Sequence, residues 1–214
     1  MIDSPTSPYL TEYMERCFQK TSMNKDFNLT EFTVKGKKVL IYDNCLPTDV
    51  FKHLQDIILS DQFPWYYNPS IATLNVKSPI EGYENDNEGY QFVHPFYRIQ
   101  IFVWSPLAEI IYPVLELLNP RAWLRVKANM GPRYSKHLVG GWHYDAGLEP
   151  TKPYVDSLTA QLFMNTNNGY TLMESGDKIK SVENRLMLHP CDILHTGISQ
   201  TDTKVRVVLN FNFF

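Results

Sequence analysis

The sequence predicts an α+β protein whose N-terminal helices cover one face of a C-terminal double-stranded β-helix, or jelly-roll barrel. From Arg121 to the C-terminus, seven short β-rich runs alternate with turn residues, and no long helical pattern lies among them. Helical periodicity is found only before Pro120. With 214 residues and 43% apolar side chains the chain suits one core, so we expect a single domain over residues 1–214.

The N-terminal elements follow from periodicity and turn residues. Residues 1–30 are polar with scattered Pro and Ser, which predicts a surface arm or a partly disordered segment. Residues 31–34 and 38–43 predict two strands about a turn at 35–37. In the following helix apolar residues recur at helical spacing, and Thr48 is a plausible N-cap. His53 in that helix has apolar neighbours, so we interpret it as structural.

The middle of the chain, residues 31–120, is interpreted as helical and loop support with a possible lid. Residues 61–97 are dense in Pro, Asn, Gly and aromatics, which is typical of a long loop or of short strands joined by turns. Trp65, Tyr66 and Tyr67 either form a wall over a pocket or cover the core. A second, buried helix is predicted over residues 106–118, and residues 121–214 form the barrel core.

Composition excludes several classes of function. A formal charge of −3 provides no general attraction to nucleic acid backbones or anionic membranes, so we expect no duplex nucleic acid and no membrane partner. Stacking of single-stranded nucleic acid on aromatics stays open. Cys17, Cys45 and Cys191 are odd in number and widely spaced, which favours a reducing compartment. No leader or membrane-spanning run is present, so we expect a cytoplasmic protein.

The stretch GGWHYDAG at residues 140–147 carries the first candidate metal ligands. If it is extended, His143 and Asp145 project from the same face. A third ligand is sought among the late histidines. His195 ends a short run at a Thr-Gly turn, where a ligand at a barrel mouth is useful, whereas His189 precedes Pro190 and is interpreted as a packing residue. His189, or less readily His137, remains an alternative ligand.

Two imidazoles and one carboxylate leave coordination positions open, as in non-haem Fe(II) oxygenases, although zinc fits the same ligands. Arg206 adds a second feature to the barrel interior. In the last strand it shares a face with Val208, Asn210 and Asn212, while the opposite face is apolar and is expected to pack under the helices. An unpaired interior arginine is costly, so we expect it to bind a carboxylate.

These residues together resemble the 2-oxoglutarate and Fe(II)-dependent dioxygenases. The resemblance rests on His143-x-Asp145, on His195 within Pro-x-Asp-x-x-His, and on Arg206 eleven positions later. VLIYDNCLPTDVFKHL is similar to the initial strand and helix of the short, prolyl 4-hydroxylase-like members of bacterial and phage type. NTNNGYTLME is similar to their mid-barrel strand. The likeness covers the chain from about residue 38 to its end.

The resemblance implies a hydroxylase in which His143, Asp145 and His195 bind Fe(II) and 2-oxoglutarate is the cosubstrate. Dioxygen is consumed, and succinate and carbon dioxide are released. Arg206 would hold the C5 carboxylate bidentately. The sequence departs from the family at Val208, where many relatives carry Ser or Thr, so another polar residue should compensate. The substrate, a peptide or a small molecule, and the oligomeric state are not predicted.

The strand WLRVKANM provides a candidate partner for Arg206. Trp123, Arg125, Lys127 and Asn129 alternate with apolar residues, so the polar set faces inward if helices cover the apolar face. Asn129 can then hydrogen-bond the cosubstrate, as an asparagine on this strand does in some nucleic-acid-repair relatives. Alternatively Asn129 only caps the turn before Gly131, with Arg125 and Lys127 solvated. A non-catalytic cupin-like metal- or carbohydrate-binding module is the alternative to the enzyme.

Overall fold

A computed structural model describes residues 24–71, 76–86, 88–100, 103–149 and 152–214. Most of the predicted N-terminal arm, together with Cys17, lies outside the described residues. The elements, in chain order, are β1 (Asn28–Val34), β2 (Lys37–Asp43), α2 (Thr48–Ile58), β3 (Tyr66–Asn68), β4 (Gln91–Arg98), β5 (Val103–Trp104), η1 (Pro106–Ile111), α3 (Tyr112–Leu118), β6 (Trp123–Pro132), β7 (Gly147–Glu149), β8 (Lys152–Pro153), β9 (Leu158–Phe163), β10 (Tyr170–Met173), β11 (Lys178–Lys180), β12 (Arg185–Pro190), β13 (His195–Ile198) and β14 (Val205–Phe213).

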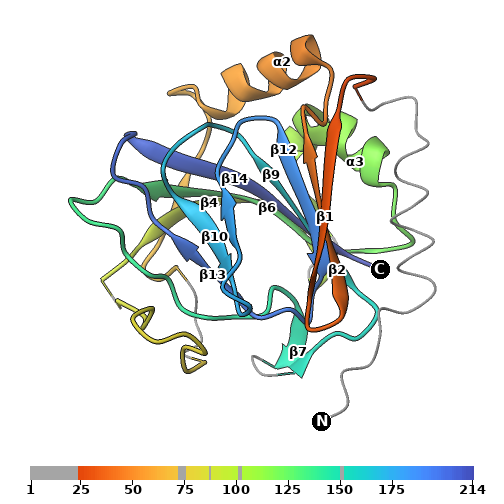
Figure 1. Ribbon diagram of the computed structural model, residues 1–214. Coiled ribbons are helices and arrows are strands. Elements are labelled where there is room, and N and C mark those ends of the chain that lie inside the picture. The colour runs from red at the N-terminus through yellow and green to blue at the C-terminus, as the bar shows by residue number, and fades with distance from the viewer. Residues whose placement is uncertain (1–23, 72–75, 87, 101–102, 150–151) are drawn as a thin grey trace.

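Two antiparallel sheets face each other and form the predicted jelly roll (Figure 1). The large sheet has nine strands, with the order β1-β2-β12-β9-β14-β6-β4-β3 and with β5 paired to β4. The small sheet has the order β11-β10-β13, and isolated bridges from Val139 to Ile198 and from His143 to His195 extend it by one further segment. The predicted fold class is confirmed. Among the described helices, none is both long enough and apolar enough to cross a membrane.

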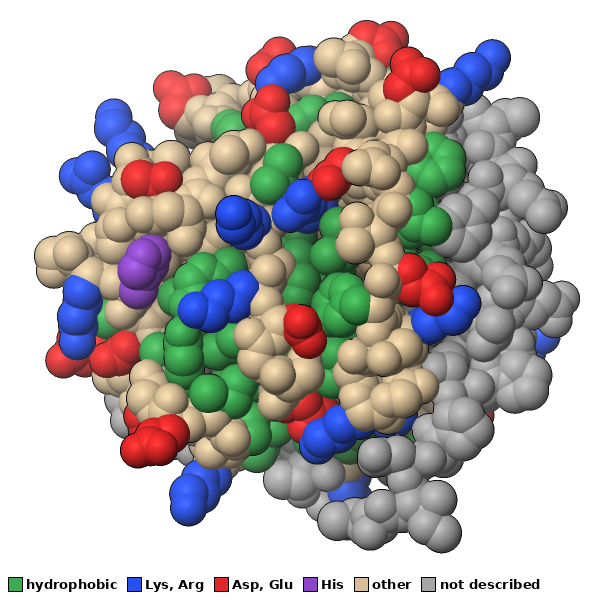
Figure 2. Space-filling view, in the orientation of Figure 1, with side chains coloured by type: hydrophobic (Ala, Val, Ile, Leu, Met, Phe, Trp, Pro, Cys, Tyr) green, Lys and Arg blue, Asp and Glu red, His purple; other side chains and the backbone are tan. Residues whose placement is uncertain are grey.

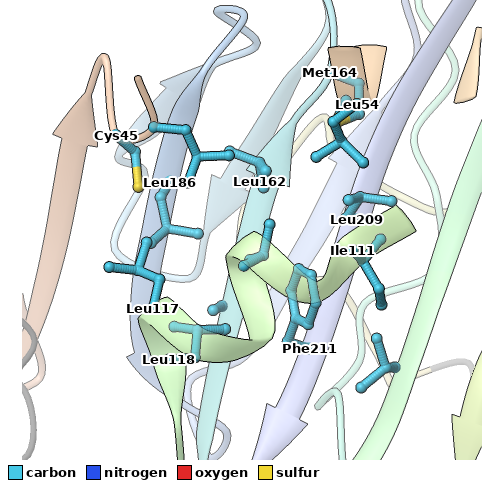
Figure 3. Close-up of a cluster of buried hydrophobic side chains, with 14 of the residues drawn as sticks. Cys45, Leu54, Ile111, Leu117, Leu118, Leu162, Met164, Leu186, Leu209 and Phe211 are labelled. Atoms are coloured by element: carbon cyan, nitrogen blue, oxygen red, sulfur yellow. The ribbon is translucent and has the colours of Figure 1, made fainter. Parts of the chain in front are cut away.

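The outer face of the large sheet carries the main hydrophobic core. Apolar residues at alternate positions of β6, β9, β12 and β14 pack against α2, η1 and α3. Figure 3 shows Leu117 and Leu118 of α3 lying over Leu162, Leu186 and Phe211 of the strands. The expected packing of the apolar face of the last strand under the helices is therefore confirmed.

The inner face of the same sheet is polar along two neighbouring strands. Lys127 lies directly opposite Asn210, and Asn129 lies opposite Val208 in the β6–β14 register. Residues opposite each other in an antiparallel pair point to the same side. Because the other faces of these strands are in the outer core, the polar set points into the barrel. A smaller apolar cluster that includes Phe163, Met187 and Val208 fills the interior beside it.

Two predicted helix details are wrong. Thr48 is the first helical residue and not the N-cap, because Pro47 holds the extended cap position and its carbonyl accepts from Phe51 N. The helix predicted over 106–118 is divided into the 3-10 helix η1 and the α-helix α3. Pro113 explains the division, since it lacks the N–H that a continuous α-helix would direct to the carbonyl of residue 109.

The ligand-bearing segments also differ from the predicted strands. His195 begins β13 instead of ending a run, because residues 191–193 turn and Ile193 N bonds Pro190 O. The segment around His143 is no regular strand and pairs through isolated bridges only. Gly140 allows a close approach there: its N–H donates to Gly197 O at 2.9 Å, and a Cβ would lie 3.1 Å from that oxygen.

Candidate metal centre and its pocket

His143, Asp145 and His195 meet inside the barrel, with ligand atoms all within 4.8 Å of one another. His143 and His195 are antiparallel backbone partners, with His143 N bonded to His195 O at 3.0 Å and the reverse bond at 3.2 Å. Their ring centroids are 4.7 Å apart, with the ring planes tilted by 49°. Asp145 and His195 are buried, and the His143 side chain is 23% exposed, which leaves the centre accessible from one side.

Backbone carbonyls set the tautomer of both histidines. His143 Nδ1 lies 2.8 Å from Gly141 O, and His195 Nδ1 lies 3.0 Å from Ile193 O. A carbonyl only accepts, so each Nδ1 carries the hydrogen and each neutral ring presents an Nε2 lone pair. His195 Nε2 lies 3.3 Å from Asp145 Oδ2 and His143 Nε2 lies 3.8 Å from Asp145 Oδ1. Three lone-pair donors therefore converge.

A cation fits this donor set. Asp145 Oδ2 is buried and has no hydrogen-bond partner. Burial lowers the pKa of His143 to about 4, so this ring is a neutral ligand at physiological pH. Burial opposes the charge on both Asp145 and His195. Even so, His195 and His143 hold the pKa of the Asp145 carboxyl well below its usual value, and Asp145 raises the pKa of His195. Two imidazoles and one carboxylate suit Fe(II) or Zn(II).

Two residues orient the carboxylate of Asp145. Arg125 Nη2 donates to Asp145 O at 2.5 Å and to Asp145 Oδ1 at 3.3 Å, and Asn210 Nδ2 donates to the same Oδ1 at 3.2 Å. Arg125 Nε is held in turn by Asn212 Oδ1 at 2.9 Å. The donors occupy Oδ1 and leave Oδ2 for a metal, as is typical of partners that orient metal ligands. The alternative that Arg125 is only solvated is wrong.

The other candidate histidines lie outside the triad. His137 is exposed, and its Nδ1 bonds Ser199 O. His189 is fully buried on β12, with its ring 5.1 Å from that of His195. His189 Nδ1 bonds Pro190 O, and His189 Nε2 has no hydrogen-bond partner. His189 therefore packs beside His195.

Arg206 lies on the inner face of β14 at the far end of the same interior. Its Nε donates to Ser181 Oγ at 2.7 Å and its Nη2 donates to Thr171 Oγ1 at 3.3 Å, while the guanidinium lies over the Phe163 ring. Burial lowers the pKa of Arg206 to about 10. None of the ion pairs among the described residues includes it. Gly169 leaves room for the side chain, because a Cβ there would lie 3.0 Å from Arg206 Cδ.

A chain of polar contacts joins Arg206 to the metal ligands. Thr171 Oγ1, which accepts from Arg206, donates to Gln161 Oε1 at 3.3 Å, and Gln161 Nε2 lies 3.5 Å from His195 Nε2. The guanidinium and the triad therefore share one interior. Asn129 is opposite Val208 and shares the inner face with Arg206, and its Oδ1 is buried without a partner. Because β6 continues to Pro132, Asn129 lies within the strand and does not cap a turn.

Because Val208 stands where relatives carry Ser or Thr, we expected another polar residue near Arg206, which the sequence did not identify. The side chains that donate or accept hydrogen bonds there are those of Thr171 and Ser181. Thr171 had a signal, the Gly-Tyr-Thr motif of the mid-barrel strand. Ser181 had none, because it follows the short strand β11, which no sequence pattern predicted. Arg125 and Asn210 were placed on the correct faces by alternation, but their contacts with Asp145 depend on how the 140–147 segment folds back.

The aromatic residues after α2 lie in two different environments. Trp65 packs against Phe63 and the outer core, as expected if it covers the core. Tyr66 and Tyr67 lie on the short edge strand β3 and are exposed. Tyr67 contacts Tyr90 and Phe92 of the neighbouring region.

Comparison with known proteins identifies the fold. No family model matches the sequence, and no curated protein matches it. Among solved structures, a prolyl hydroxylase from Trichoplax adhaerens, in complex with a hypoxia-inducible-factor peptide fragment, is similar over 100% of this chain and 96% of its own, with a TM-score of 0.55 and 11% identity. A 2OG-Fe(II) oxygenase family oxidoreductase from Burkholderia pseudomallei is similar over 82% and 85%, with a TM-score of 0.52 and 13% identity. The chain has the fold of the 2OG-Fe(II) oxygenases.

Proposed function

We propose that the protein is a non-haem Fe(II)- and 2-oxoglutarate-dependent dioxygenase that hydroxylates a small-molecule or peptide substrate. One observation carries the proposal: three metal-ligand atoms converge in the same barrel interior as a guanidinium that has no carboxylate partner among the described residues. A metal-binding or carbohydrate-binding module would need the barrel, but it would have no use for that half-buried guanidinium. The fold shared with 2OG-Fe(II) oxygenases adds support.

In this proposal His143, Asp145 and His195 hold Fe(II) on one face and leave its remaining positions open. When bound, the metal and 2-oxoglutarate provide an oxidative decarboxylation in which one oxygen atom of dioxygen enters the substrate C–H bond and the other enters succinate, with release of carbon dioxide. The backbone acceptors of the two Nδ1 hydrogens keep both Nε2 atoms directed at the metal. Arg125 and Asn210 keep Asp145 Oδ2 in the same direction.

The residues around Arg206 form the proposed cosubstrate end of the pocket. The N–H groups of Arg206 not used by Ser181 and Thr171 provide a planar fork for the C5 carboxylate. The family pattern has a hydroxyl two residues after the arginine, where this chain has Val208; in this proposal Thr171 of β10 contributes a hydroxyl beside Arg206 instead. Asn129, with its unpartnered Oδ1, lies along the same wall. Phe163 and Val208 are apolar and buried here, so they exclude water from the ion pair that Arg206 would form with the C5 carboxylate.

We expect no broad duplex-binding surface. On the face shown in Figure 2, basic and acidic side chains are interspersed and no large area carries one sign. Nonspecific affinity for duplexes depends on many Lys and Arg contacts to phosphates. A substrate that enters the barrel mouth as a small molecule or an extended peptide is compatible with this surface.

The test is an anaerobic titration with Fe(II) and 2-oxoglutarate, followed by measurement of succinate when oxygen is admitted. One equivalent of iron should bind, and succinate should form. Replacement of His143, Asp145 or His195 by Ala should abolish or severely weaken stoichiometric iron binding, whereas His137→Ala, a matched exposed histidine, should behave as wild type. Iron binding without 2-oxoglutarate binding would favour the non-catalytic module, and full binding by His195→Ala would transfer the ligand role to His189.

A further inference from the structure

The inner face of β6 carries a cation that the proposed cofactors do not use. Arg125, Lys127 and Asn129 follow one another on this face. Arg125 is bonded to Asp145, and Asn129 lies towards the cosubstrate end. The Lys127 ammonium, between them and half-buried, makes no hydrogen bond or ion pair with any other described residue. An unpaired ammonium in a partly desolvated wall is unfavourable, so such a position is explained by an anion that arrives with a ligand.

Lys127 lies next to the metal ligands. It is directly opposite Asn210, whose Nδ2 donates to Asp145 and whose Oδ1 is buried without a partner. On its other side Lys127 is paired with Pro95 of β4, whose side chain has no acceptor for the ammonium. Burial, and next the charge of Arg125, lower the pKa of Lys127 to about 7. The charge of Asp145 raises this pKa and that of Arg98 lowers it. Arg98 lies directly opposite Arg125 in the β4–β6 register.

The charges of the loaded site do not balance without a further anion. The C5 carboxylate of 2-oxoglutarate is matched by Arg206, and its C1 carboxylate together with Asp145 is matched by the two charges of the metal. Arg125 keeps its hydrogen bond to Asp145. Asp145 is then already matched, so Arg125, Lys127 and the exposed Arg98 remain as a surplus of basic side chains, and Arg98 forms no ion pair with a described residue. A surplus of one sign in a cleft attracts a ligand of the opposite sign.

We propose that the primary substrate carries an anionic group, a carboxylate or a phosphate ester, that pairs with Lys127. This inference rests on the proposed function and deepens it by naming the substrate's chemical class. The ion pair fixes one end of the substrate beside Asn210, whose free Oδ1 can accept a hydrogen bond from the same molecule. Lys127 is then a specificity-determining residue and not a ligand of the cosubstrate.

The experiment uses full-length protein loaded with Mn(II) and saturating 2-oxoglutarate. Mn(II) in the site shortens the nuclear relaxation times of small molecules bound nearby. Matched probes separate charge from shape: N-acetylglycine with N-acetylglycinamide for a carboxylate, and glycerol 3-phosphate with glycerol for a phosphate ester. For at least one pair we expect the anion to be relaxed at least fivefold more strongly than its neutral partner. The pair that shows the difference identifies the anion.

Variants assign the effect to a residue. Lys127→Gln should remove the preference for the anion while metal and 2-oxoglutarate affinities stay within about threefold of wild type. Lys127→Arg should retain it, and Lys180→Gln, which removes an exposed lysine of β11, should not change it. Equal relaxation of anion and neutral partner in wild type overturns the inference, as does a preference that survives Lys127→Gln.

Two further outcomes separate this inference from the proposed function. If Lys127→Gln weakens 2-oxoglutarate binding tenfold, or if more 2-oxoglutarate displaces the anionic probe, Lys127 belongs to the cosubstrate and the inference is wrong although the proposed function stands. If wild-type protein binds neither the metal nor 2-oxoglutarate, the proposed function fails and the inference fails with it.

Discussion

Replacement of Arg206 by glutamine removes the cation at the closed end of the pocket and tests the assignment of that end to 2-oxoglutarate. Two of the guanidinium's bonds go to Ser181 and Thr171, which leaves enough N–H groups for a two-bond contact with a carboxylate. Hydrogen bonds to charged groups contribute about 1.5–3 kcal/mol each. Loss of two therefore costs about 3–6 kcal/mol, or on the order of 10² to 10⁴ in the Kd of 2-oxoglutarate.

The assay is calorimetric titration of 2-oxoglutarate into Zn(II)-loaded protein, which binds without turnover. Arg206→Lys keeps the charge but not the planar fork, so its Kd should lie between those of wild type and Arg206→Gln. Neither variant should change zinc affinity. Metal-free Arg206→Gln should melt at the same temperature as wild type or higher, because a half-buried cation without a carboxylate partner is removed. If Arg206→Gln binds 2-oxoglutarate within threefold of wild type, the assignment is wrong.

Three other changes test neighbouring residues. Asn129→Ala should weaken 2-oxoglutarate binding by about 1 kcal/mol, roughly fivefold in the same titration, with metal binding retained; unchanged affinity would direct attention to Tyr134, Lys127 or Arg125. Arg125→Gln removes one of the two donors to Asp145 Oδ1 and should weaken zinc binding by about tenfold in a chelator competition, whereas unchanged zinc binding would mean that Asn210 alone orients the carboxylate. Burial, and next the charge of His195, lower the pKa of His189 to about 4. Between the ordinary histidine pKa of about 6.5 and about pH 4, the unfolded chain therefore binds a proton at His189 that the folded chain does not. The free energy of unfolding should therefore fall as pH drops from 6.5 towards 4, and His189 should account for about 2 kcal/mol of the loss between pH 7.5 and 5. Urea unfolding of metal-free His189→Gln should lack this part of the loss. A variant whose free energy of unfolding depends on pH as strongly as that of wild type would refute the prediction.

Strand alternation explains why so much of the interior was predictable. In β14 and β6 every second residue is apolar, so a period of two separates the face under the helices from the face inside the barrel. That rule placed Arg206, Asn210, Arg125 and Lys127 inside. It also predicted that His143 and Asp145 would point together, although the segment that carries them pairs through bridges and not as a full strand.

The same rule could not predict contacts between the two sheets. Which late histidine faces Asp145 depends on how β13 packs over β9. The local sequence favoured His195 because of the Thr-Gly turn beside it, but it does not determine how the two strands pack. The hydroxyl of Thr171 similarly reaches Arg206 across the barrel, so its role depends on tertiary structure. The division of the 106–118 helix, in contrast, had a local signal in Pro113 that hydrophobic periodicity concealed.

The backbone pairing of His143 with His195 means that the metal ligands are also the residues that close the barrel. Few regular ladder bonds hold the 139–145 segment to β13, so a divalent ion on the two side chains would act as a cross-link between distant parts of the sequence. A ligand that binds only the folded state stabilises it by an amount that grows with the logarithm of its concentration relative to its Kd. Folding of the barrel edge and loading of the metal are therefore linked equilibria, and amide protons of residues 140–145 should exchange with solvent more slowly when the metal is bound.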